Sequence, residues 1–143
     1  MSNHPFVGVW RLLSFEARAS SGEVSYPLGR DALGVLLCGQ DGYMAGSLMR
    51  ADRANFKSAD IGAASPEEKL AAFDSYNSYC GTYEVRLGKI IHHGKLSFFP
   101  NWSGADQERY FEFAGDRLTL RTPPMTVGGV ERTAILTWQR VNS

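Results

Sequence analysis

Apolar and polar residues alternate in short runs along most of this chain, and that spacing predicts β-strands whose side chains point to opposite faces in turn. Turn residues such as Asp41-Gly42 and Gly88-Lys89 separate the runs. The predicted strands cover residues 6–16, 24–28, 32–38, 43–49, 81–87, 90–99, 107–113, 117–121 and 133–141. About eight to ten short strands at this spacing predict a mainly β fold, either a sandwich or an antiparallel barrel.

Residues 65–79 interrupt the strand pattern with the signals of a helix. Ser65 can cap the first turn, Pro66 suits the first helical position, and Glu68 completes a capping box. Apolar side chains follow at helical spacing and predict a helix over residues 66–79. Because an amphipathic helix must pack its apolar face on something, we expect this helix to cover the end of a barrel.

The composition indicates one domain, residues 1–143, that is large enough to bury a core. Lys and Arg number 15 and Asp and Glu number 15, so the net charge is zero. This balance offers no basic surface for nucleic acid or an anionic membrane. No apolar run reaches the roughly 18 residues that a transmembrane helix needs.

Two further features bear on the cellular compartment of the protein. The first residues, MSNHPFVGVW, lack the basic and apolar regions of a secretory signal. Cys38 and Cys80 do not form a CxxC motif. We therefore expect a cytoplasmic protein with two free thiols, and a Cys38–Cys80 disulfide is the less favoured alternative.

Two adjacent histidines, His92 and His93, lie within one predicted strand. Since successive strand residues point to opposite faces, one imidazole must face the interior and the other must face out. Ser97 and Phe99 share the parity of His93, which favours His93 as the inward residue. An inward histidine is either a core residue with satisfied hydrogen bonds or an acid/base group in a pocket, because its charge changes near neutral pH.

The next predicted strand brings more polar groups to the same interior. Glu108 and Glu112 form its natural outward pair. The alternate positions then face inward: Gln107, Arg109, Phe111 and Phe113. Arg109 either forms a cross-strand salt bridge or binds an anion or carbonyl group of a ligand, since a buried cation without a carboxylate is costly.

Aromatic residues make up 12% of the chain and fit an aromatic-lined interior. Tyr43 and Tyr83 lie on predicted strands and are candidates for a pocket wall, because a phenol has an apolar body and a polar tip. Asn101 and Trp102 either anchor a turn or form the rim of the pocket. The candidate ligand-binding residues are Tyr43, Tyr83, His92, His93, Phe99, Asn101, Trp102, Gln107, Arg109 and Phe111.

No motif predicts a metal or cofactor. Adjacent strand residues point apart, so His92 and His93 do not form the i, i+2 pair that could chelate one ion. The chain has no phosphate-binding loop, dinucleotide-binding fingerprint or GxSxG motif. We expect neither a metal nor a cofactor.

A set of short motifs occurs in order along nearly the whole chain. They are Gly8-x-Trp10-x-Leu12-x-Ser14-Phe15-Glu16, Tyr26-Pro27-Leu28-Gly29, Asp41-Gly42-Tyr43-Met44, Tyr83-Glu84-Val85, His92-His93, Pro100-Asn101-Trp102, Gln107-x-Arg109, Asp116-Arg117-Leu118-Thr119-Leu120 and Thr122-Pro123-Pro124. Together they resemble the bacterial lipocalin-like domain family of calycin-type β-barrels. The chain departs from the pattern of ordinary secreted lipocalins, because we expect no signal peptide and the predicted helix lies in mid-chain.

The resemblance implies an up-and-down barrel with an internal ligand cavity, but not one substrate. Gly8-Val9-Trp10 matches the Gly-x-Trp signature of lipocalins, and Arg140 fits the arginine that packs over that tryptophan. We expect Trp10 and Arg140 to be a structural plug at the closed end, with a ligand role as the alternative.

Two functions fit these residues. The first is binding of a small, largely apolar, aromatic molecule, with Arg109 and the inward histidine at its polar end. The alternative is a cofactor-free isomerase, cyclase, lyase or hydratase, with His93 as the base and Arg109 or Tyr83 stabilising negative charge. A pure interaction protein without a cavity is the weakest option, and an exposed strand edge would allow a homodimer.

Overall fold

The computed structural model describes residues 4–141. Within that range the strands are β1 (Gly8–Ala19), β2 (Val24–Ser25), β3 (Leu33–Cys38), β4 (Tyr43–Met49), β5 (Tyr76–Arg86), β6 (Lys89–Ser97), β7 (Asp106–Ala114), β8 (Arg117–Arg121), β9 (Met125–Val127) and β10 (Val130–Arg140). The helices are α1 (Pro66–Asp74) and two short 3-10 turns, η1 (Ile61–Ala63) and η2 (Pro100–Trp102).

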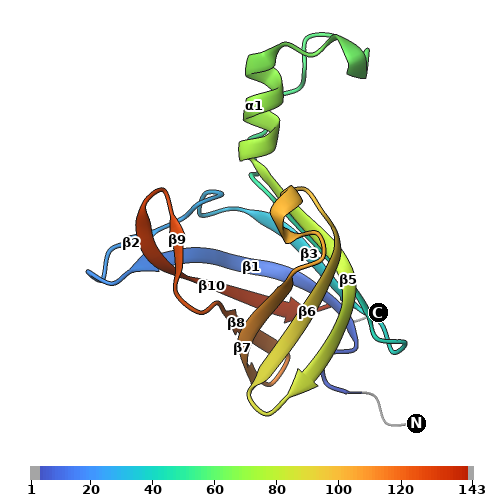
Figure 1. The fold of residues 1–143 in the computed structure, drawn as a ribbon, viewed down its shortest axis with the longest axis vertical. Helices are drawn as coiled ribbons and strands as arrows, with labels where there is room; N and C mark the ends of the chain where they lie inside the picture. Colours follow the sequence, from blue (N-terminus) through green and yellow to red (C-terminus); the bar gives the residue numbers. More distant parts are fainter. Residues whose placement is uncertain (1–3, 142–143) are drawn as a thin grey trace.

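The strands form a closed antiparallel barrel, which confirms the predicted fold class (Figure 1). The sheet order is β2-β1-β3-β4-β5-β6-β7-β8-β10-β9, and β1 also pairs with β10 to close the ring. The closing register runs from Trp10 opposite Arg140 to Ala19 opposite Arg132. The short strands β2 and β9 lie outside the ring of eight strands, at its rim.

One end of the barrel is filled by aromatic side chains. Phe6, Trp10, Ile90 and Leu118 are fully buried there. Phe6 lies edge-on against Phe111 and Phe113, with 4.9 Å between ring centroids in each pair. Phe113 and Phe111 both come from β7, whose burial alternates along its whole length as expected for inward and outward faces.

Arg140 covers the same end from outside. Its guanidinium lies 4.2 Å from the centroid of the Trp10 ring, and its Nη1 donates a hydrogen bond to Val7 O at 2.9 Å. Gly8 has a φ of +137°, and a Cβ at this position would lie 2.9 Å from Arg140 Nη1. The arginine therefore depends on a glycine at position 8. Neither Trp10 nor Arg140 lines the cavity described below.

Helix α1 begins with the predicted capping box. Ser65 Oγ accepts a hydrogen bond from Glu68 N at 3.2 Å, and Glu68 Oε1 accepts one from Ser65 N at 2.9 Å. The helix ends at Asp74, earlier than the predicted residue 79. It stops there because the next residues join the barrel, where Tyr76 pairs with Met49 on β4.

The segment 50–75, which contains α1, extends away from the barrel and does not lie across its end as expected (Figure 1). No residue of α1 is buried, and its apolar side chains Leu70 and Phe73 are 62% and 47% exposed. The nine-residue helix carries too few apolar side chains to form a covering face. Its main neighbour in the barrel is β5, onto which it leads directly.

Within residues 4–141, no helix has the length and apolar character needed to cross a bilayer. Cys38 and Cys80 are both free thiols. Burial raises the pKa of Cys38 to about 12, so this thiol stays protonated. The cytoplasmic location and the homodimer stay predictions.

Candidate functional site

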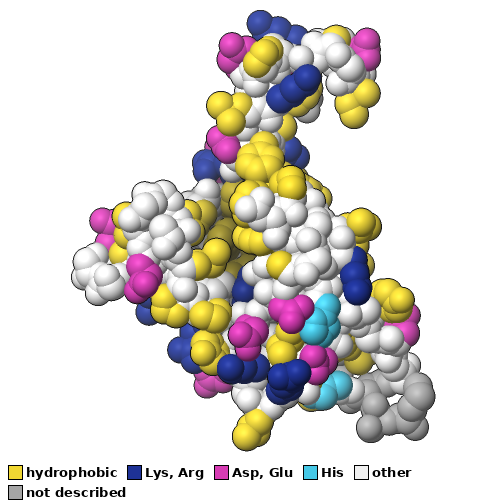
Figure 2. All heavy atoms as spheres, in the orientation of Figure 1, with side chains coloured by type: hydrophobic (Ala, Val, Ile, Leu, Met, Phe, Trp, Pro, Cys, Tyr) yellow, Lys and Arg dark blue, Asp and Glu magenta, His cyan; other side chains and the backbone are white. Residues whose placement is uncertain are grey.

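The end of the barrel opposite the aromatic plug contains a cavity of about 800 Å³. This volume lies within the roughly 300–1,000 Å³ that is typical of small-molecule pockets. Its wall is mainly apolar and includes Phe15, Leu28, Leu36, Met44, Leu48, Leu120, Leu136 and Trp138. Ala17, Gly46 and Ala134 are small residues in the same wall, and they leave space that larger side chains would fill. Figure 2 shows the hollow, with apolar side chains visible inside it.

Strand β6 places His92 inside the barrel and His93 outside. His92 is 2% exposed and belongs to the cavity wall, whereas the outward side chain of His93 is 32% exposed. The prediction that His93 faces inward was therefore wrong.

A β-bulge explains the error. Cys80 pairs with Leu96 but the next residue, Gly81, pairs with Gly94, so Lys95 is an extra residue on β6. The extra residue shifts the alternation by one, so Ser97 and Phe99 share their face with His92 and not with His93. A Cβ on Gly81 would lie 1.9 Å from His93 O, so the close approach of the strands at the bulge requires glycine there.

His92 forms a buried pair with a tyrosine of the neighbouring strand β5. Its Nδ1 lies 2.6 Å from Tyr79 Oη. Its Nε2 has no hydrogen-bond partner among the described residues. Burial, followed by the positive charges of Arg109 and His93, lowers the pKa of His92 to about 3. The imidazole is therefore neutral at neutral pH.

Tyr79 is the functional candidate that the sequence interpretation missed. The predicted helix extended through residue 79, so this tyrosine was not among the predicted pocket residues. Burial raises the pKa of its phenol, and the positive charge of nearby Arg109 partly offsets that rise. The alternation from Tyr79 to Gly81 to Tyr83 on one strand face was the available signal.

Arg109 brings a positive charge to this part of the wall. It lies on the inner face of β7 and is partly buried. Its Nη1 donates to Glu108 O at 2.8 Å, and its Nη2 donates to Gln107 Oε1 at 3.4 Å. No carboxylate of residues 4–141 lies within ion-pair distance of it, so the alternative of a cross-strand salt bridge is wrong. Arg109, Tyr79 and His92 thus form a polar side within an apolar cavity.

Aromatic residues of the η2 turn form part of the rim. Trp102 and Phe99 both line the cavity, and their rings meet edge-on with 5.2 Å between centroids. Trp102 also meets the edge of the Tyr79 ring at 6.2 Å. The turn therefore connects the rim to the polar side of the wall.

The opposite rim comes from the flap formed by β2 and β9, which the sequence interpretation did not connect with a pocket. Ser25, Met125, Val127 and Arg132 line the cavity from this side. Arg132 Nη1 lies 3.3 Å from Ser25 Oγ and 3.9 Å from Glu23 Oε1. These contacts join chain segments more than 100 residues apart, which local sequence patterns do not reveal.

Comparison with known proteins agrees with this architecture. A family described as the lipocalin-like domain has a model that matches residues 7–141. The chain belongs to this family. It is also 29% identical over 107 residues to the 4'-hydroxy-3'-methoxypropiophenone carrier protein ppsC of Aspergillus oryzae, a match that covers 68% of this chain and 96% of the relative. No solved structure matches.

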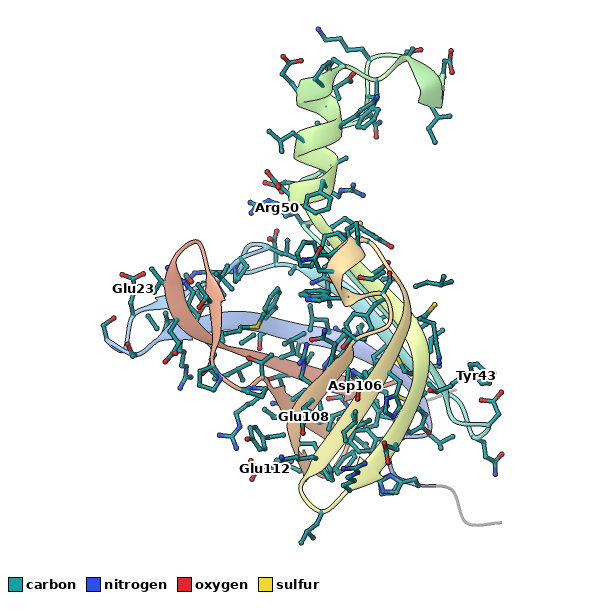
Figure 3. The ribbon with its side chains drawn as sticks, in the orientation of Figure 1. Glu23, Tyr43, Arg50, Asp106, Glu108 and Glu112 are labelled. Carbon is teal, nitrogen blue, oxygen red and sulfur yellow. The ribbon has the colours of Figure 1, made fainter. Side chains whose placement is uncertain are left out.

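Several predicted site residues lie away from the cavity of this lipocalin-like barrel. Tyr43 is 62% exposed and points away from the barrel (Figure 3). Tyr83 faces inward, but its Oη donates to Gly39 O at 2.8 Å and its ring packs against the core. Asn101 is exposed and is not part of the cavity wall. The strand and turn positions of these residues do not tell which face Tyr43 and Asn101 are on, or how deep the core around Tyr83 fills the barrel.

The two remaining candidates on β7 lie on either side of Arg109. Phe111 belongs to the aromatic plug, below the cavity. Gln107 lines a second hollow, of about 470 Å³, beside Pro123 and Pro124. Arg109 lines both hollows, so its side chain lies between them.

His93 has a distinct environment on the outer surface. Its Nδ1 lies 2.6 Å from Asp106 Oδ1, and its Nε2 lies 2.9 Å from Glu84 Oε1. Hydrogen bonds to these two carboxylates raise the pKa of His93, and they lower the pKa of Glu84. The three residues tie β5, β6 and β7 together outside the cavity. Within residues 4–141 no cluster of three or more His, Cys, Asp or Glu side chains could hold a metal ion.

Proposed function

We propose that this protein binds a small, largely apolar molecule with an aromatic ring in the barrel cavity. The observation that carries the proposal is the cavity of about 800 Å³, whose wall is mainly apolar and carries Arg109, Tyr79 and His92 together on one side. Membership of the lipocalin-like domain family supports small-molecule binding. A relative named as a carrier of a substituted propiophenone supports it as well.

The wall suggests how such a molecule lies. Leu36, Met44 and Leu136 offer apolar contact to its body, and burying that surface favours binding. Phe99 and Trp102 at the rim can contact an aromatic ring edge-on or face-on. The polar end of the molecule then lies toward Arg109.

Filling the cavity tests this proposal. Gly46 on β4 lines the cavity, and a Cβ added there would meet only Leu36 Cδ1 at 3.6 Å, an ordinary contact. We expect Gly46→Leu to fold but to lose at least about tenfold in affinity for 4'-hydroxy-3'-methoxypropiophenone, used as the probe in titration calorimetry. Ala45→Leu, on the outward face of the same strand, is the matched control and should bind like the wild type. Equal affinity in Gly46→Leu would place the ligand elsewhere.

The geometry favours binding over the alternative of a cofactor-free enzyme. His93, the base predicted from the sequence, lies outside the cavity with its two carboxylates. His92 is inside, but a group with a pKa of about 3 is a weak base at neutral pH. The other buried acid/base group of the cavity wall is Tyr79, and burial raises the pKa of its phenol, so it stays protonated at neutral pH.

A further inference from the structure

The cavity wall carries one cation whose hydrogen bonds go only to neutral oxygens, and two buried ring nitrogens that have no hydrogen-bond partner among residues 4–141. Arg109 carries a full positive charge and has no carboxylate of the described residues within ion-pair distance. Trp138 Nε1, which can only donate, is buried without a partner among residues 4–141. His92 Nε2 is buried in the same way, with no partner in that range. Unpaired buried polar groups are costly, so their presence in one cavity wall points to a missing acceptor.

The contact between Tyr79 and His92 indicates whether His92 Nε2 donates or accepts a hydrogen bond. The positive charge of Arg109 acts on the phenol oxygen of Tyr79 and stabilises negative charge there. That field favours the arrangement in which the phenol hydrogen points away from Arg109, toward His92 Nδ1, 2.6 Å away. Since neutral imidazole carries one hydrogen, Nε2–H is then the donor.

Negative charges of the cavity lie at the rim or are already engaged. Glu23 is 3.9 Å from Arg132, on the β2–β9 flap. Asp74 lines the cavity at the end of α1, where the projecting segment joins the barrel. Among the ion pairs of residues 4–141, none joins Glu23 or Asp74 to Arg109. A negatively charged ligand group beside Arg109 would therefore meet an uncompensated cation.

We propose that the ligand is an aromatic carboxylic acid, bound as the carboxylate with its two oxygens toward Arg109 and its ring toward Phe99 and Trp102. This inference rests on the proposed function and specifies the chemistry of the ligand. A planar guanidinium and a carboxylate match in geometry, and the bond between them is stronger than a bond between neutral groups. A ketone of the same shape offers one neutral acceptor and leaves the charge of Arg109 uncompensated.

A matched pair of probes tests the inference. The carboxylate 3-(2-naphthyl)propanoate and the ketone 4-(2-naphthyl)butan-2-one have the same ring and linker and differ only in the polar end. At pH 7 we expect the carboxylate to bind at least about tenfold more tightly to the wild type in titration calorimetry, because hydrogen bonds to a charged group are the stronger ones.

Arg109→Met should remove that preference and leave the affinity for the ketone almost unchanged. Arg121→Met is the matched control, because Arg121 is an exposed arginine of the neighbouring strand β8 and does not line the cavity. It should keep the preference, and thermal unfolding of both variants checks that they are folded. The proposal is overturned if the wild type binds the ketone as tightly as the carboxylate, or if the preference survives in Arg109→Met. In either case the proposed small-molecule binding still stands, whereas binding of neither probe would count against both.

Discussion

The two ends of this barrel use the same strands for opposite purposes. At the closed end, Phe6, Trp10 and Leu118 fill the interior completely. At the open end, Gly46, Ala17 and Ala134 leave a cavity of about 800 Å³. The closed end gains stability from buried apolar surface, while the open end keeps polar groups and empty space that do not stabilise the fold. The difference lies in side-chain volume and polarity, since the backbone ladder continues through both ends.

The inner face of strand β7 changes from plug residues to cavity residues along its length. Phe113 and Phe111 pack into the plug, and Arg109 lines the cavity next along the same inner face. Strand β6 changes in the same direction, from the fully buried Ile90 to His92. We therefore expect substitutions at the closed end to change stability and those at the open end to change binding.

The largest effect should come from the closed end. Trp10→Ala removes a fully buried indole together with its hydrogen bond to Phe6 O and its contact with Arg140. We expect a loss of about 3–5 kcal/mol in the free energy of unfolding, measured by chemical denaturation. Val9→Ala, at a neighbouring position that is 41% exposed, should change it by about 0.5 kcal/mol or less.

Ligand affinity of the folded protein is the second measurement on the same variant. If the two ends are independent, Trp10→Ala keeps the ligand affinity of the wild type under all conditions in which the variant is folded. Phe113→Leu is a milder change in the same plug and serves if Trp10→Ala does not fold. A drop in affinity that follows the loss of stability would contradict the division between the two ends.

Much of the division could be predicted from the sequence, because β7 is regular. Its strict alternation is enough to assign Glu108 and Glu112 to the outside and Arg109 to the inside from the residue pattern alone. The prediction failed on β6, where the extra residue Lys95 shifts the alternation, and a bulge of this kind has no clear signature in the residue pattern.

The predicted end of the helix was wrong, and the part that the β2–β9 flap plays in the cavity was not predicted, for a different reason. Residues 76–79 fit a helical pattern locally, but Tyr79 belongs to β5 because that segment pairs with β4. Tertiary pairing outweighed the local preference. Met125 and Arg132 line the cavity because segments far apart in the sequence meet there. The pattern of neighbouring residues in the sequence does not reveal such contacts.

The polar side of the open end should make the fold sensitive to acid. His92 has a folded-state pKa of about 3, below its ordinary value of 6.5. Between these pH values the unfolded chain binds a proton that the folded protein does not, so stability falls as pH decreases from about 6.5 toward 3. The slope from this group approaches about 1.4 kcal/mol per pH unit.

His92→Gln tests this effect because glutamine is neutral and can still pair with the Tyr79 hydroxyl. We expect the free energy of unfolding of His92→Gln to decrease less than that of the wild type between pH 6.5 and pH 4. At pH 8 both forms carry no charge at position 92, so this pH is the reference for the comparison. An unchanged slope would mean that His92 takes up its proton in the folded protein as readily as in the unfolded chain. Below about pH 6.5 its Nδ1 would then be protonated and could not accept a hydrogen bond from the Tyr79 hydroxyl.

The smallest effect should come from His93, on the outside of the same strand, and it should have the opposite sign. Its pKa is raised by Asp106 and then by Glu84, so its contribution is fully present below about pH 6.5 and is lost as pH rises through the folded-state value. His93→Gln should therefore destabilise the protein at pH 5.5 and have little effect at pH 9, with only a modest difference because the group is solvent-exposed and screened. Chemical denaturation of the wild type and of His93→Gln at pH 5.5 and pH 9 measures the difference in their free energies of unfolding. Opposite trends for the two adjacent histidines would show that the inner face of β6 loses stability for its cavity while the outer face gains it, whereas parallel trends would mean that both imidazoles share one environment.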